Sequence, residues 1–96
     1  MLKIQTMFDQ MKEELDGAEG YACLATKIKD KDRSIAEMYI NMAKNEVEHF
    51  TRIYELACKL QESGDIETMH TDIFEWLCDK ILMQAARVKF MVDSYK

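Results

Sequence analysis

The scarcity of helix-breaking residues limits this chain to a helical fold. No proline occurs among its 96 residues, and the glycines are Gly17, Gly20 and Gly64. Proline breaks a helix interior because it lacks a backbone N–H and clashes with the preceding turn, and a helical glycine is less favourable than alanine by about 1 kcal/mol. Residues that favour helices, such as Ala, Leu, Met, Glu and Lys, are frequent throughout. The composition therefore predicts an all-α protein.

Apolar residues at three- and four-residue spacing divide the chain into three long helices. The predicted helices cover residues 2–29, 33–62 and 66–95. Asp32 or Ser34 is expected to cap the second helix, because both side chains can accept a hydrogen bond from its free amide groups. Gly64 suits the left-handed residue that ends this helix, and Asp65 or Thr71 can start the third.

The length of the chain corresponds to one domain, which we place at residues 1–96. Its first two helices are expected to form an antiparallel hairpin, along which the third helix packs. Apolar residues of the third helix cover more than one stripe, so that helix needs two neighbours. We therefore expect a homodimer or a higher homo-oligomer, in which a second hairpin completes a four-helix bundle.

Charge and hydropathy exclude several classes of function. Eighteen acidic against thirteen basic residues give a net charge of −5, which disfavours binding to nucleic acid. The chain has no uncharged stretch near the roughly 18 apolar residues of a membrane span, and its first residues do not resemble a secretory signal. Cys23, Cys58 and Cys78 form no C-x-x-C pair and are expected to be reduced thiols. A cytoplasmic location without membrane contact follows as the expectation.

Two ionisable residues interrupt the apolar stripe that we assign to the second helix. Glu46 and His49 stand where the stripe of Ile35, Met38 and Met42 would place apolar side chains. A spacing of three residues puts the carboxylate and the imidazole on one face, about one turn apart. Burying both groups is unfavourable by several kcal/mol unless they are compensated, and a divalent metal ion would compensate both.

Glu14 is the predicted partner on the first helix. The turn centre lies about 16 residues after Glu14 and about 15 before Glu46, so antiparallel helices of equal rise bring the two level. One chain then supplies Glu14, Glu46 and His49, and two chains supply four carboxylates and two histidines. This is the ligand set of a carboxylate-bridged di-iron site, and manganese is the alternative metal.

Two segments resemble the rubrerythrin-like branch of the ferritin-like superfamily. They are EELDGAEGYACLA at residues 13–25 and AKNEVEH at residues 43–49. The resemblance implies a ferritin-like fold with a glutamate seven residues before a tyrosine on one helix and an E-x-x-H motif on the next. In this sequence these residues are Glu14, Tyr21, Glu46 and His49, and Tyr21 is expected to orient a ligand carboxylate.

Two weaker candidates for metal binding lie near or on the third helix. Glu75 and Cys78 have the same three-residue spacing as Glu46 and His49, although a buried cysteine usually serves as a small apolar residue. His70 is followed by the polar residues Thr71 and Asp72 and is expected to be solvated rather than to bind a metal.

Three functions are compatible with these features. A di-iron site predicts iron oxidation or handling, or the reduction of peroxide. The alternative is a non-enzymatic helical assembly protein, in which the Glu/His cluster only fixes the register between helices. A metal sensor or carrier without redox turnover is the third. The first two differ in whether folding and assembly depend on metal.

Overall fold

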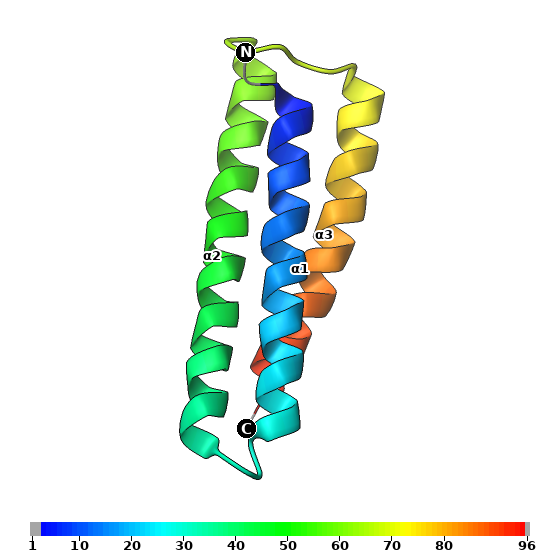
Figure 1. The fold of residues 1–96 in the computed structure, drawn as a ribbon. Helices are drawn as coiled ribbons and strands as arrows, with labels where there is room; N and C mark the ends of the chain where they lie inside the picture. Colours follow the sequence, from blue (N-terminus) through cyan, green and yellow to red (C-terminus); the bar gives the residue numbers. More distant parts are fainter. Residues whose placement is uncertain (1–2, 96) are drawn as a thin grey trace.

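A computed structural model of the protein describes residues 3–95 and contains three helices. They are α1 at Ile4–Ile28, α2 at Arg33–Ser63 and α3 at Thr71–Asp93. Helices α1 and α2 form an antiparallel hairpin, and α3 lies along one side of it, running in the same direction as α1 (Figure 1). The all-α prediction is confirmed. The predicted helical residue 2 and the domain ends at residues 1 and 96 lie outside the described residues.

The ends of α2 follow from its capping residues. The Asp32 carboxylate accepts a hydrogen bond from the backbone N–H of Ile35 at 3.0 Å, so Asp32 is the N-terminal cap. Gly64 ends the helix with a φ of 74°. This left-handed conformation is unfavourable for residues with a Cβ, which explains why a glycine stands here. Both residues were expected in these roles, although Ser34 was an alternative to Asp32.

Helix α3 begins at Thr71, so the predicted range from residue 66 is wrong, and Thr71, the second of the two starts offered by the sequence, is the first helical residue. The preceding segment is held to α2 by Gln61, whose amide donates to the Met69 carbonyl at 2.6 Å and accepts from the Met69 N–H at 3.1 Å. These bonds take up backbone groups that a helix would need. The N-terminal cap is His70, whose Nδ1 accepts from the Asp72 N–H at 3.2 Å.

The buried face of α2 also differs from the predicted one. The buried residues are Ala36, Ile40, Ala43, Phe50 and Ala57. Met38, which we expected inside, is 49% exposed, and Ile35 is exposed as well. Alanines on the inner faces of both helices allow α1 and α2 to pack closely, with Ala18, Ala22 and Ala25 on α1. Alanine contributes little to hydrophobic periodicity, so the larger side chains of the neighbouring stripe dominated the sequence pattern.

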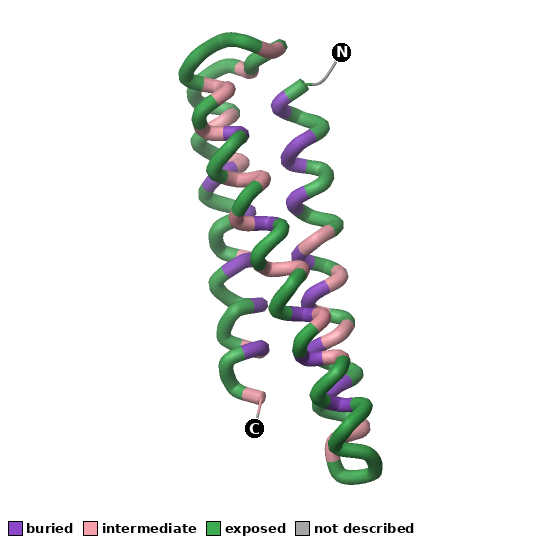
Figure 2. The backbone as a smooth tube through the Cα atoms, turned by 90° about the vertical axis from the view of Figure 1, so that its left-hand side faces the viewer, coloured by how far each residue is buried: buried purple, intermediate pink, exposed green. Residues whose placement is uncertain are grey.

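The protein is elongated and thin. Its principal extents are 50 × 22 × 15 Å and its radius of gyration is 15.3 Å, whereas a compact domain of this length has about 12.5 Å. Buried positions lie along the inward side of each helix (Figure 2). Within residues 3–95, no helix has the length and apolar character needed to cross a membrane. Such a shape leaves large parts of each helix uncovered by the chain itself.

Candidate metal centre

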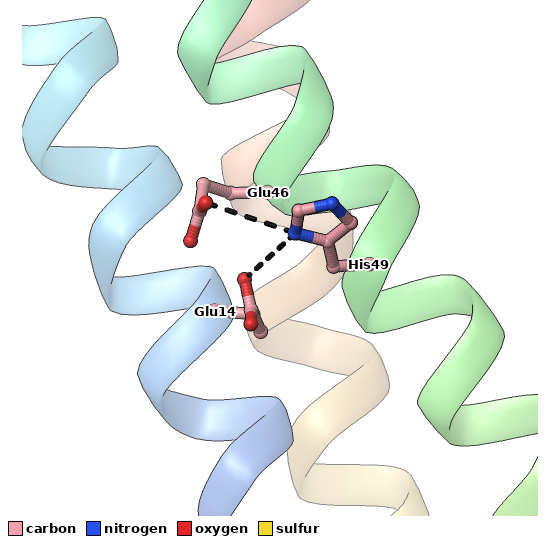
Figure 3. Close-up of side chains that lie close together, drawn as sticks. All are labelled: Glu14, Glu46 and His49. Atoms are coloured by element: carbon pink, nitrogen blue, oxygen red, sulfur yellow. Dashed lines mark hydrogen bonds and ion pairs between the residues drawn. The ribbon is translucent and has the colours of Figure 1, made fainter.

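The structure brings Glu14, Glu46 and His49 together near the middle of the hairpin (Figure 3). Each offers one ligand atom, and the three atoms lie within 4.8 Å of one another. His49 Nδ1 is 3.4 Å from Glu14 Oε2 and 3.8 Å from Glu46 Oε1. The pairing across the hairpin follows from two straight antiparallel helices joined by a short turn. That these residues bind a metal ion stays a prediction.

The cluster lies at the margin of the α1–α2 interface rather than in the core. The side chains of Glu14 and Glu46 are 20% and 27% exposed, and that of His49 is 50% exposed. The prediction that Glu46 and His49 interrupt the buried stripe is therefore corrected, because the buried face of α2 lies beside them. Their surroundings still desolvate the two carboxylates in part, while the imidazole remains open to solvent.

The cluster faces away from α3. Helix α1 contacts α3 from its other flank, where Asp16 accepts a hydrogen bond from Gln84 and Glu19 pairs with Arg87. In Figure 3 the labelled side chains stand in front of the hairpin, and α3 passes behind it. The third helix therefore leaves the open side of the cluster uncovered.

Exposed apolar side chains occupy the face on which the cluster lies. Helical geometry places them in the outer stripe of α2 and on the corresponding flank of α1. They are Leu24, Ile35, Met38 and Leu56. Single exposed apolar residues are ordinary, but a group of them around a polar cluster is typical of an interaction surface.

The Glu14 carboxyl group destabilises the ionised form of Glu46. The pKa of Glu46 is raised above its ordinary value, chiefly by a hydrogen bond with the Glu14 carboxyl, then by partial burial and by the Glu14 charge. His49 acts in the opposite direction. Adjacent carboxylates repel each other, and a cation between them would remove this repulsion. The donor set therefore fits a hard or intermediate divalent metal such as iron or manganese.

Gly17 is a functional candidate that the sequence analysis did not identify. A Cβ at this position would lie 3.1 Å from Glu46 Oε2, which is closer than ordinary contact. The absence of a side chain leaves room for the Glu46 carboxylate against α1. The available signal was a glycine in the middle of a helix, where it lowers stability and usually has a packing or functional reason.

Tyr21 lies on α1 beyond the cluster and packs against another tyrosine. Its ring stacks on Tyr39 with centroids 6.0 Å apart and an interplanar angle of 19°. Tyr21 is two helical turns from Glu14, about 10.5 Å along the axis. Among the hydrogen bonds of residues 3–95, none joins its hydroxyl to Glu14 or Glu46. The expectation that Tyr21 orients a carboxylate stays a prediction.

The weaker candidates lie outside this cluster. Glu75 is exposed, Cys78 packs in the core and His70 caps α3. Within the described part of the chain, Glu14, Glu46 and His49 form the one group of three ligand-bearing residues close enough to share an ion.

Comparison with known proteins supports a family assignment. The family model described as Rubrerythrin matches residues 9–86, a range that includes the three clustered residues. No curated protein and no solved structure matches the chain.

Proposed function

Because the chain belongs to the rubrerythrin family, we propose that it is a di-iron carboxylate protein whose metal site forms between two copies. The observation that carries this proposal is the half-site itself. Glu14, Glu46 and His49 converge on the open side of a hairpin, within 4.8 Å of one another. Two such half-sites facing each other supply four carboxylates and two imidazoles, the ligand set of ferritin-like di-iron proteins.

The surface around the half-site supports association with a second copy. Leu24, Met38 and Leu56 are each more than 40% exposed on this side of the hairpin. A two-fold axis through the cluster would bury these side chains against their equivalents, and burial contributes about 25 cal/mol per Å². The same axis would cover the half-exposed imidazole of His49. The result is a four-helix bundle with the metals in its interior.

The proposed reaction is the oxidation of iron or the reduction of peroxide. With two ferrous ions bound, the site would supply two electrons to O₂ or peroxide as both ions are oxidised to the ferric state. The role of this chain is to position the donors: Glu14 and Glu46 as carboxylate ligands, and His49 as the terminal imidazole. Gly17 leaves the space in which Glu46 lies. The Tyr21–Tyr39 stack lies farther along the hairpin, about two helical turns from Glu14.

Anaerobic loading with Fe(II), followed by desalting, tests this proposal. We expect about one iron per chain, hence two per dimer, and a change in absorbance when O₂ is admitted. Glu46→Gln should lose most of the iron. Glu13→Gln removes the exposed carboxylate next to Glu14 along the chain, and this variant should retain its iron. No retained iron in the unmodified protein, or equal retention in both variants, would contradict the proposal.

The second candidate is a metal-independent assembly protein. The exposed apolar residues around the half-site favour it, because their burial would stabilise a dimer without any metal. In that case the Glu/His cluster only aligns the two hairpins. The two functions differ in one measurement: the assembly protein keeps its oligomeric state and its stability when Fe(II) is added or chelated.

A further inference from the structure

Helix α3 carries a second apolar surface, on the side that faces away from the core. We call it the α3 outer stripe. It consists of Ile73, Trp76, Lys80, Met83, Arg87 and Phe90. The four apolar members are 53%, 58%, 75% and 73% exposed in this order. Their alternating spacing of three and four residues is that of a helix that packs against another helix.

The outward position of this stripe follows from the core. Cys78, Ile81, Ala85 and Val88 are the buried residues along the middle of α3. At 100° per residue, Trp76 and Met83 lie on the far side of the helix from them. Figure 2 shows the exposed outer turns of α3 beside its buried inner positions. Apart from the ion pair between Arg87 and Glu19 on α1, the stripe therefore contributes little to the fold of a single chain.

We propose that the α3 outer stripe packs against the same stripe of a second copy in an antiparallel pair. The stripe is symmetric about the midpoint between residues 81 and 82. An antiparallel pair centred there places Ile73 opposite Phe90, Trp76 opposite Arg87, and Lys80 opposite Met83. In antiparallel coiled coils the two kinds of inward position pair in this way.

Charge selects the antiparallel arrangement over the parallel one. In a parallel pair each residue faces its own equivalent, so Lys80 would meet Lys80 and Arg87 would meet Arg87. The antiparallel pair instead places each Arg87 guanidinium over the Trp76 ring of the other copy, a favourable cation–π contact. Trp76 already takes part in such a contact within the chain, since Lys80 Nζ lies 4.4 Å from its ring centre.

The positive charge of Arg87 is balanced by Glu19 on α1. Arg87 Nη1 forms an ion pair with Glu19 Oε1 at 2.7 Å, so the arginine is held in place before association. The Lys80 stem can lie along the apolar stripe with its ammonium group in solvent. Neither basic residue therefore has to be buried unpaired.

The stripe offers enough area for a specific contact. The exposed parts of its four apolar side chains amount to roughly 500 Å² per copy, or about 1,000 Å² for the pair, which is near the lower bound for specific interfaces. Helix α3 passes behind the hairpin, on the side away from the Glu14/Glu46/His49 cluster (Figure 3). Both surfaces can thus be occupied at once, which would extend a dimer to a tetramer or a larger assembly.

The mass of the metal-free protein, measured by light scattering across a concentration series, tests the stripe. Met83→Lys places a cation opposite Lys80 and should weaken the α3 contact at least tenfold. Leu82→Lys likewise replaces an exposed apolar residue of α3 with lysine, but outside the stripe, and should leave association unchanged. Circular dichroism confirms that each variant remains helical, as expected for exposed positions.

A second substitution at the same position tests the register. Met83→Glu places its carboxylate opposite Lys80 in the antiparallel pair and should preserve association. In a parallel pair it would face its own equivalent and disrupt association. Loss of association in Met83→Glu would therefore overturn the antiparallel register.

Substitution of the opposite face separates this proposal from the shared metal site. Met38→Lys should disrupt only the interface around the metal cluster. If Met38→Lys reduces the mass and Met83→Lys does not, the α3 contact is overturned while the shared-site dimer stands. A monomeric unmodified protein would also overturn the α3 contact. Reduction by Met83→Lys, with or without an effect of Met38→Lys, supports it.

Discussion

Gly17 on α1 lies against the carboxylate of Glu46 on α2, so close that a Cβ on Gly17 would be 3.1 Å from Glu46 Oε2. The glycine lowers the intrinsic stability of α1, since alanine in a helix interior is about 1 kcal/mol more favourable than glycine. The space it leaves is filled by a carboxylate whose pKa is raised by its neighbour Glu14. Gly17 thus makes α1 less stable than an alanine would, and it leaves space for the carboxylate of the proposed ligand Glu46.

Gly17→Ala should lower iron retention by displacing the Glu46 carboxylate. Gly20→Ala is the matched control, because a Cβ at Gly20 meets no atom within 4 Å. The control should gain up to about 1 kcal/mol in unfolding free energy and bind iron normally, whereas Gly17→Ala should gain less. Urea unfolding and iron-to-chain ratios measure both effects. Equal iron retention by the two variants would argue against a role for the Gly17 space.

Neutralising Glu46 should stabilise the metal-free protein at neutral pH. A carboxyl group whose pKa is raised by folding favours the folded state below its ordinary pKa of 4.5, and this contribution is lost as the pH rises through the raised value. Glu46→Gln should therefore be more stable than the unmodified chain at pH 7, by less than about 1 kcal/mol because solvent screens the pair. The difference should shrink at pH 4.

Thermal unfolding in the presence of a chelator measures this effect. Glu13→Gln serves as the control, because Glu13 is exposed on α1. A Glu46→Gln variant that is less stable than the unmodified protein at pH 7 would show that the carboxylates do not oppose folding.

Metal binding should raise the unfolding temperature. A ligand that binds only the folded state stabilises it by about 2.7 kcal/mol at a free concentration of 100 times Kd. We expect this shift with Fe(II) under anaerobic conditions and with Mn(II), and a chelator should reverse it. His49→Ala should abolish the shift. His70→Asn changes the other histidine, which caps α3, and this variant should still be stabilised by the metal.

Tyr21→Phe should leave stability nearly unchanged, because the phenyl ring can still stack on Tyr39. If the Tyr21 hydroxyl orients a ligand carboxylate in the assembled site, this variant should oxidise iron more slowly at unchanged iron content. Tyr39→Phe removes the other hydroxyl of the stack and provides the comparison. Equal oxidation rates in all three proteins would show that the Tyr21 hydroxyl has no role in iron oxidation.

The sequence predicted the three helices and both ends of α2, but it did not predict the buried face of α2 or decide where α3 begins. Asp32 and Gly64 mark helix ends because their side-chain chemistry or conformational freedom acts locally. The start of α3 depends on Gln61, which reaches across to Met69 from another helix. A contact between distant residues of this kind leaves no local signal.

The candidate site shows the same division. Helical rise alone aligns Glu14 with Glu46, so their proximity follows from the length of the hairpin. Their position at the margin of the core does not follow from the sequence pattern. The inner face of α2 is lined by alanines such as Ala36 and Ala43, which contribute little to that pattern. The space at Gly17 also depends on how closely the two helices approach.

The central claim is that two chains share one two-iron site. Anomalous diffraction at the iron edge from crystals of the loaded protein tests it most directly. We predict two iron positions about 3.5 to 4 Å apart, as in other two-metal sites, each within bonding distance of Glu14, Glu46 or His49 from both chains. Iron held by a single chain, or no iron at these residues, would contradict the claim.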